Sequence, residues 1–353
     1  MSETKKRYHY LDLLRILACV SVIFNHTGET GFLAFSLQPA FSLRSWIYAA
    51  VSILTSINVP LFFMISGVTL LKKEESLKKT YMRILRFVLL IVIFSGLLCI
   101  RDILRGQEWT PVSFLKYIFS YNYSYTYWYL YYYIAFLMIT PLLRSMVSNL
   151  QDKYFLYMFV LTFAFSLNSA LSEGVTRIFL NESLNINWFY QECIMFPFFG
   201  YYLHHRLDRN KLRVYLPVLI GLSAVCLLCV TGLTLFRQAE LGYMDETTLV
   251  YHRTFRFLFA ITVFALFRYC FEEKEFSRSA GRILSYLSSL TLGIYLLHEP
   301  IIHMNISYRV LDVFLSFAEG TMVPGLLISA YAFIAAAVIT AVMKKIPGLK
   351  RII

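Results

Sequence analysis

Hydrophobic residues in this chain occur in long runs, and short polar segments separate one run from the next. About 20 consecutive apolar residues form a helix that can cross the ~30 Å hydrocarbon core of a bilayer. The sequence therefore predicts an all-α fold, a polytopic membrane helix bundle that forms a single domain over residues 1–353. It predicts about ten transmembrane helices, near residues 10–27, 46–71, 84–104, 125–143, 154–172, 188–203, 214–236, 254–271, 283–302 and 322–343.

The composition and the placement of charge agree with a membrane protein. Hydrophobic residues make up 58% of the chain and charged residues 15%, whereas soluble domains have about 25% charged residues. The net charge of +12 does not indicate nucleic-acid binding, because the basic residues lie in short segments between apolar runs. With both termini cytoplasmic, the inner segments hold 23 Lys and Arg residues and the outer segments hold 9. This asymmetry follows the positive-inside rule and fixes the predicted orientation.

The first predicted helix carries ionisable residues in an otherwise apolar sequence. On a helix of ~3.6 residues per turn, His26 lies within ~20° of Arg15 and within ~40° of Asp12, and Cys19 falls on the same stripe. An ionisable side chain in lipid costs ~2.5–3.5 kcal/mol or more, so this stripe must face protein or water. We expect it to line an internal polar path, with His26 ~16 Å beyond Arg15 along the helix axis.

Aromatic residues concentrate in residues 117–133, at the start of the fourth predicted helix. One interpretation is an interfacial belt, in which amphipathic rings sit at the depth of the lipid headgroups. The other is a platform for sugar rings, and it makes Trp128 and Tyr129 candidate pocket residues. Glu192, inside the sixth predicted helix, is a further intramembrane carboxylate and a candidate substrate contact.

Histidines form two further groups. His298, Glu299 and His303 stand at the end of the ninth predicted helix, but their spacing differs from the His-Glu-x-x-His of zinc proteases. We therefore expect no metal site. His204 and His205 lie in a basic segment and are expected to be solvated.

Five motifs, taken in order, resemble the acyltransferase-3 family of membrane proteins. The first is the Arg and His separated by ten residues in the first helix, Arg15 and His26. The others are Asn58-Val-Pro-Leu-Phe-Phe-Met-Ile-Ser66-Gly67, Arg83-Ile-Leu-Arg86, Trp128-Tyr129-Leu130 with Pro141-Leu142-Leu143, and Ser289-Leu-Thr291-Leu-Gly293-Ile-Tyr295-Leu-Leu-His298. Each motif alone is weak evidence, and the order of all five across residues 12–298 carries the resemblance.

The resemblance implies transfer of an acyl group, by family default acetyl, from cytoplasmic acyl-CoA. The acceptor would be a hydroxyl of a cell-envelope carbohydrate or glycolipid outside the plasma (inner) membrane. Arg83 and Arg86 would bind the CoA phosphates, because arginine binds phosphate in bidentate fashion, and the lysines at 72, 73, 78 and 79 would meet the same phosphates. The alternative is that these six residues are ordinary positive-inside anchors. Arg15 is a further candidate CoA contact. Tyr295 and His298 would lie at the substrate site. The resemblance assigns Glu299 to the substrate site less firmly, since family members often have a different residue at that position. Many relatives append a soluble domain, so a separate partner protein is a further expectation.

The resemblance makes His26 the candidate catalyst. Imidazole, with a reference pKa of about 6.5, suits a general base that activates an alcohol. It also suits a nucleophile that carries the acyl group transiently, and the sequence does not choose between the two. Asp12 and Arg15 would either take part in catalysis or form a salt bridge in the wall of the path. Arg15 has two further possible roles, as a contact of the thioester oxyanion or of CoA.

Two other functions use the same features. A transporter of a small solute or a surface glycan also places charges inside the membrane. However, paired Gly- or Pro-interrupted helices in two halves of the chain, which are typical of transporters, are not evident. A non-catalytic partner in surface-polymer assembly is the third possibility, and the presence of both Arg15 and His26 argues against it.

Overall fold

The computed structural model describes residues 7–171, 190–242 and 254–353, and these parts of the chain contain helices and no strands. The α-helices before the first gap are α1 (His9–Asn25), α2 (Leu43–Thr55), α3 (Asn58–Leu70), α4 (Leu77–Leu104), α5 (Pro111–Ser120), α6 (Trp128–Asn149) and α7 (Asp152–Leu171). The later ones are α8 (Phe196–Tyr201), α9 (Arg209–Leu241), α11 (Arg256–Phe271), α12 (Arg278–Ile302), α13 (Asn305–Ala318), α14 (Val323–Met343) and α15 (Pro347–Lys350). Shorter turns include η3 (Tyr125–Tyr127) and two π-helical segments, η6 (Tyr190–Met195) and η7 (Tyr202–Arg206).

Long apolar helices confirm the prediction of an all-helical membrane protein. In the described residues, six helical segments are long and apolar enough to cross a membrane: Leu43–Leu70, Leu77–Leu104, Tyr125–Asn149, Arg209–Leu241, Arg278–Ile302 and Val323–Met343. Each of the ten predicted stretches contains helix, although parts of those near 154–172 and 188–203 lie outside the described residues. The number of crossings and the side on which the termini lie stay predictions.

Several helices differ from their predicted bounds, among them those predicted near 46–71 and 84–104. The stretch near 46–71 is broken into α2 and α3, because Pro60 lacks an N–H donor and is tolerated only in the first turn of a new helix. The Asn58 side chain accepts a hydrogen bond from the Val59 N–H at 2.6 Å at this start. The helix predicted from residue 84 begins seven residues earlier, at Leu77. Its first turn carries Lys78 and Lys79, which an apolar run does not include.

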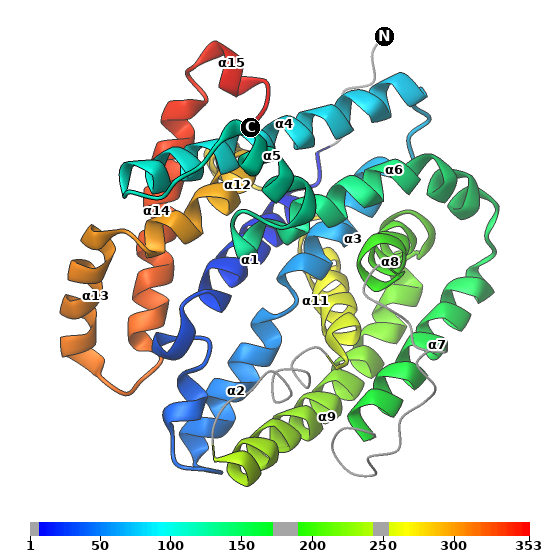
Figure 1. Ribbon diagram of the computed structural model, residues 1–353. Helices are drawn as coiled ribbons and strands as arrows, with labels where there is room; N and C mark the ends of the chain where they lie inside the picture. The colour runs from blue at the N-terminus through cyan, green and yellow to red at the C-terminus, as the bar shows by residue number, and fades with distance from the viewer. Residues whose placement is uncertain (1–6, 172–189, 243–253) are drawn as a thin grey trace.

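Helix α1 lies in the middle of the bundle, with α3 and α12 beside it and α14 and α11 also packed against it (Figure 1). Its polar stripe meets α12, where the Cys19 thiol lies 3.7 Å from the Thr291 carbonyl. Polar residues that lipid would not tolerate therefore face neighbouring helices and internal cavities, as the stripe predicts.

Helix α3 is held against α8 at a very close crossing. A Cβ atom added at Gly67 would collide with the backbone of Pro197, and one added at Gly200 would collide with the backbone of Met64. Glycine is the only residue that allows two helix backbones to approach this closely. The crossing fixes the position of α3, which carries several residues of the candidate site.

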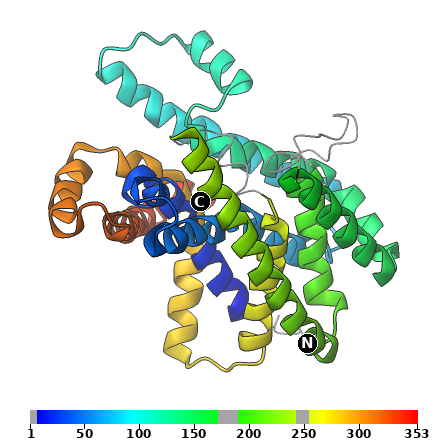
Figure 2. The ribbon, with the colours of Figure 1, turned by 90° about the horizontal axis from the view of Figure 1, so that it is seen from below.

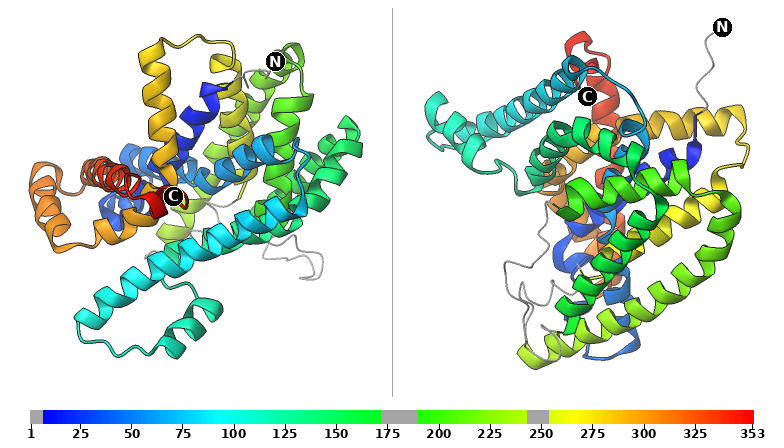
Figure 3. Two further views of the ribbon diagram at one scale, coloured as in Figure 1. Left: turned by 90° about the horizontal axis from the view of Figure 1, so that it is seen from above. Right: turned by 90° about the vertical axis from the view of Figure 1, so that its right-hand side faces the viewer.

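The end of α4 and helix α5 project from the rest of the molecule (Figures 2 and 3). With 28 residues, α4 is ~42 Å long, which exceeds the ~30 Å core of a bilayer. Helix α5 begins at a capping box, in which Thr110 and Ser113 satisfy each other's backbone N–H groups, and Pro111 occupies its first turn. The chain then returns through η3 to α6.

Candidate functional site

Two cavities open along the polar face of α1. The first, which we call the vestibule, has a volume of about 470 Å³ and lies at the start of α1. Its lining includes four cationic side chains, Arg7, Arg15, Lys72 and Lys73, and one carboxylate, Asp12. An anionic ligand would therefore be favoured there.

Asp12 is buried, and its main partner is Arg7. Both carboxylate oxygens accept hydrogen bonds of 2.9 Å from the Arg7 guanidinium, whereas the Arg15 Nη1 atom lies 3.8 Å away. The Asp12 carboxylate raises the pKa of Arg7 above its ordinary value. The predicted pair of Asp12 and Arg15 is thus part of a larger group, in which the Nδ1 atom of His9 also lies 3.4 Å from the Asp12 carboxylate. Arg15 is left facing the cavities with 32% of its side chain accessible.

His204 and His205 also line the vestibule, and the expectation that this pair is solvated is wrong for His204, whose side chain is almost fully buried. The Nδ1 atom of His204 lies 2.6 Å from the Tyr10 hydroxyl, and the Nε2 atom of His205 lies 2.9 Å from the Val68 carbonyl. Only 5% of the His204 side chain is exposed. The basic sequence around the pair suggested a solvated loop, but η7 continues α8 and turns both rings inward.

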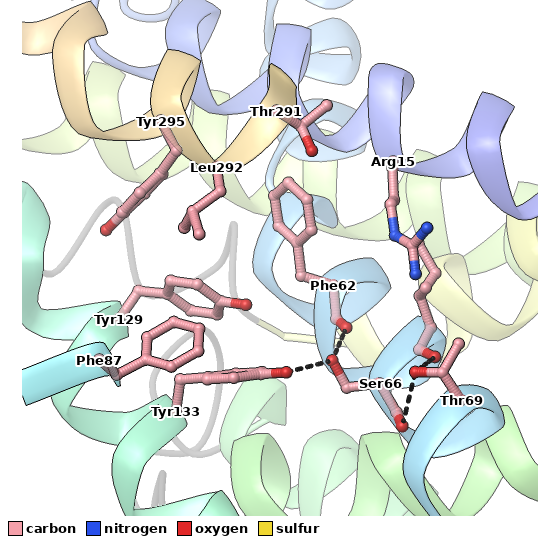
Figure 4. Close-up of a pocket in the computed structure, with 11 residues that line it drawn as sticks. Arg15, Phe62, Ser66, Thr69, Phe87, Tyr129, Tyr133, Thr291, Leu292 and Tyr295 are labelled. Carbon is pink, nitrogen blue, oxygen red and sulfur yellow. Dashed lines mark hydrogen bonds between the residues drawn. The ribbon is translucent and has the colours of Figure 1, made fainter. Parts of the chain in front are cut away.

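The second cavity, which we call the tyrosine pocket, continues from the vestibule and has a volume of about 180 Å³ (Figure 4). Arg15 and Thr69 line both cavities and mark their junction. The remaining lining residues come from α3, α4, α6 and α12: Phe62, Ile65, Ser66, Phe87, Tyr129, Tyr133, Thr291, Leu292 and Tyr295.

Hydroxyl groups follow the tyrosine pocket from Arg15 towards Tyr295. Figure 4 shows Thr69 near Arg15 and Tyr129 with Tyr295 at the other end. Ser66 donates to the Phe62 carbonyl at 2.8 Å and lies 3.3 Å from the Tyr133 hydroxyl. A narrow polar lining of this kind can accommodate a thin flexible chain, but its volume is too small for a bulky charged head.

The structure brings Tyr129 and Tyr295 together and leaves Trp128 outside the pocket. The rings of Tyr129 and Tyr295 are 5.4 Å apart at their centroids, whereas the Trp128 ring packs against Tyr132. Tyr133 was missed in the sequence, although it lies one helical turn from Tyr129 and so on the same face. Ser66 and Thr69 were also missed, although residues three apart on a helix share one face, and both line the pocket.

Beyond Tyr295, the polar face of α1 ends at two histidines in direct contact. The Nε2 atom of His298 lies 2.9 Å from the Nδ1 atom of His26. The Nδ1 atom of His298 lies 2.6 Å from the Tyr295 carbonyl oxygen. His298 is fully buried, and the ring of Tyr125 packs edge-on against His26 with centroids 5.3 Å apart. The two histidines, which come from the end of α1 and from α12, form a hydrogen-bonded pair.

Glu299 lies at the rim of the histidine pair, which is formed by His26 and His298. It accepts a hydrogen bond of 3.4 Å from the Ser124 hydroxyl and lies 3.8 Å from the Nε2 atom of His303. The neighbouring turn η3 is tied to α12, because the Tyr295 hydroxyl donates to the Thr126 carbonyl and the Tyr127 hydroxyl donates to the Leu296 carbonyl at 3.2 Å.

Glu192 is buried in η6 and pairs with Arg256 at the start of α11. Neither residue is part of the lining of the vestibule or the tyrosine pocket. Arg256 lies near the start of the helix predicted at 254–271, and a charge at the edge of a predicted span was a signal that it needed a buried partner.

Arg83 and Arg86, the expected CoA ligands, already have protein partners. Arg83 donates two hydrogen bonds to Glu75, and Arg144 donates a third to the same carboxylate at 2.9 Å. These arginines lower the pKa of Glu75 to about 2. The Nε atom of Arg86 donates to the Ile352 carbonyl at 2.7 Å. Neither arginine lines the two cavities.

Comparison with known proteins identifies one family. A family model described as an acyltransferase domain matches residues 8–343, nearly the whole chain. No curated protein and no solved structure matches the chain significantly. The match covers the histidine pair, the tyrosine pocket and every lining residue of the vestibule except Arg7.

Proposed function

The chain belongs to the acyltransferase-3 family of membrane proteins, and on this premise we propose a transmembrane O-acyltransferase. It would move an acyl group, acetyl by default, from cytoplasmic acyl-CoA to a hydroxyl of an envelope carbohydrate or glycolipid. One observation carries the proposal: two cavities share Arg15 and Thr69 on the polar face of α1 and lead to Tyr295, whose carbonyl contacts the histidine pair.

The donor would bind with its charged part in the vestibule. The phosphates would meet Arg7, Lys72 and Lys73, because these cations line the larger cavity. Arg83 and Arg86 would instead stabilise the fold through their hydrogen bonds to Glu75 and to the Ile352 carbonyl. The thin pantetheine arm would then pass Arg15 and enter the tyrosine pocket, while the anionic head stays behind because burying its charge is costly.

His26 would act at the far end of this path. As a base, it would accept the proton of the acceptor hydroxyl while that oxygen attacks the thioester carbonyl carbon. The carbon–sulfur bond would then break, and the thiolate of CoA would leave and take up a proton. As a nucleophile, His26 would first form an acyl-imidazole and pass the acyl group to the hydroxyl in a second step.

The acceptor would approach from the side of η3 and the end of α12. Tyr125, Ser124 and Glu299 lie at this rim, where they offer a ring face and hydrogen-bonding groups suited to a sugar. The protein would sit in the plasma (inner) membrane with both termini in the cytoplasm, and a separate extracytoplasmic protein would act as its partner.

The test is acyl transfer by purified protein in nanodiscs. Radiolabelled acetyl-CoA and an envelope extract are supplied to wild type, to His26→Ala and to Cys229→Ala, an exposed cysteine on α9 that serves as a handling control. We expect label on a carbohydrate with wild type and the control, and none with His26→Ala of equal thermal stability. Transfer by His26→Ala at the wild-type rate would overturn the proposal. So would a wild type that moves a solute across the membrane without using acetyl-CoA, since that result identifies a transporter.

A further inference from the structure

His298 makes two hydrogen bonds, and the first fixes where its own proton lies. Its Nδ1 atom is 2.6 Å from the Tyr295 carbonyl oxygen. A carbonyl oxygen can only accept, so the Nδ1 atom of His298 must carry the hydrogen. This follows from the chemistry of the partner and holds whichever charge state the ring has.

Burial decides the charge state of His298. The side chain is fully buried, and in the part of the chain that the structure describes no carboxylate forms an ion pair with it. Charging an imidazole in such surroundings is costly without a counter-charge. The neutral ring, with its hydrogen on Nδ1, leaves a lone pair on Nε2.

The second hydrogen bond passes this constraint to His26. The lone pair on the His298 Nε2 atom faces the His26 Nδ1 atom at 2.9 Å. A hydrogen bond at this distance between two ring nitrogens needs one hydrogen, and only His26 can supply it. His26 is therefore held with its proton on Nδ1 and its lone pair on Nε2.

We propose that His298 is a positioning residue that fixes the tautomer of His26, so that the Nε2 atom of His26 is the atom that reacts. The inference rests on the proposed acyl transfer, and both mechanisms above need this lone pair. When His26 takes up the acceptor's proton on Nε2, its Nδ1–H still donates to His298. The neutral partner then stabilises the imidazolium in place of the carboxylate that orients histidine in serine hydrolases.

The surroundings hold His298 in this geometry. The Tyr295 hydroxyl donates to the Thr126 carbonyl, which anchors the turn of α12 whose carbonyl binds His298. Helix α12 also packs along α1, where the Cys19 thiol contacts the Thr291 carbonyl. His298 lies inside α12, and His26 is the residue that caps the C-terminal end of α1. The packing of these two helices therefore sets the relative position of the two rings.

Two amide variants separate the roles of the two ring nitrogens. In His298→Gln, the longer side chain places its amide oxygen near the position of Nε2, where it can accept from His26. In His298→Asn, the shorter side chain reaches only the position of Nδ1, and His298→Leu offers no acceptor at all. We expect kcat to fall ~10²-fold in the Asn and Leu variants and less than ~10-fold in the Gln variant, with the KM for acetyl-CoA nearly unchanged.

A second readout does not depend on turnover. The ¹⁵N chemical shifts of labelled histidine in nanodiscs report the tautomer of each ring, and the spectrum of His26→Ala identifies the signals of His26 among the seven histidines. We expect His26 protonated on Nδ1 in wild type and in His298→Gln, and a shift towards the Nε2–H tautomer in His298→Leu.

The outcomes separate the inference from the proposed function. A wild-type His26 protonated on Nε2, or a Gln variant as inactive as the Leu variant, would overturn the role of His298. A wild type that shows the Nδ1–H tautomer but transfers no acyl group would support the geometry and overturn the proposed function alone.

Discussion

The two ends of helix α1 differ in how their polar groups are held. At the Arg15 end, cationic side chains line a cavity of about 470 Å³, and Lys72 is exposed. At the His26 end, the buried His298 ring contacts its partner at 2.9 Å and is tied to a backbone carbonyl. Long charged side chains around a cavity suit binding, because they attract an anion without fixing its pose. Short, buried and hydrogen-bonded groups suit catalysis, which needs fixed geometry.

The difference leads to a division of tasks that kinetics can test. Changes at the His26 end should lower the rate of the chemical step and leave donor binding nearly intact. Changes at the Arg15 end should weaken donor binding and leave the chemical step nearly intact.

The largest effect is expected from His26→Ala. Loss of a general base or nucleophile should lower kcat by about 10³-fold, while acetyl-CoA should raise the thermal stability of this variant as much as that of wild type. Single-turnover assays and thermal unfolding with acetyl-CoA measure the two quantities. If His26→Ala lost both donor binding and turnover, the proposed division of binding and chemistry between the two ends would be wrong, because both ends would then act as one site.

The next effect concerns helix α3, which contributes lining residues to both cavities. Gly67→Ala should reduce stability by about 1–3 kcal/mol, because the new methyl group collides with the backbone of Pro197 in α8. Gly221→Ala, on α9 where nothing lies near the added atom, is the matched control and should be neutral or slightly stabilising. Thermal unfolding in detergent compares the two. Equal stability of both variants would mean that the α3–α8 crossing is not as tight as described.

The stripe on α1 shows how much the sequence determined. Helical periodicity placed Asp12, Arg15 and His26 on one face, because a helix repeats at ~3.6 residues whatever packs against it. It could not give Arg7 as the main partner of Asp12, since the side chain reaches back from outside the helix. The contact between His26 and His298 joins residues 272 positions apart, and only the packing of α12 on α1 decides it.

The basic residues near α4 show the same limit. Arg83 and Arg86 stood in a motif, whereas Lys72 and Lys73 were one of two lysine pairs that the sequence could not tell apart. The sequence cannot show that Glu75, eight residues before Arg83, accepts hydrogen bonds from it. It also cannot show that the chain after α3 turns the two lysines towards the vestibule.

A smaller effect is therefore expected from the vestibule lysines. Replacing Lys72 and Lys73 with Gln should weaken acetyl-CoA binding about 10-fold, with kcat unchanged, because two charges near the phosphates are lost. The difference from wild type should shrink at high salt, since screening weakens the attraction. The matched control replaces Lys78 and Lys79, which are exposed and line neither cavity. Equal weakening by both pairs would show that only net charge matters.

The smallest effect is expected at Glu75, outside both cavities. Arg83 and Arg144 lower its pKa to about 2, whereas an unfolded glutamate has a pKa near ~4.3. The ion pairs therefore stabilise the fold fully above about pH 5, and this contribution is lost as the pH falls towards 2. Because Arg83 is partly exposed, we expect only about 1–2 kcal/mol. Thermal unfolding between pH 7 and pH 3 should show wild type losing part of its advantage over Glu75→Gln. A constant difference across that range would mean that Glu75 acts through packing alone and that Arg83 is available to bind the donor.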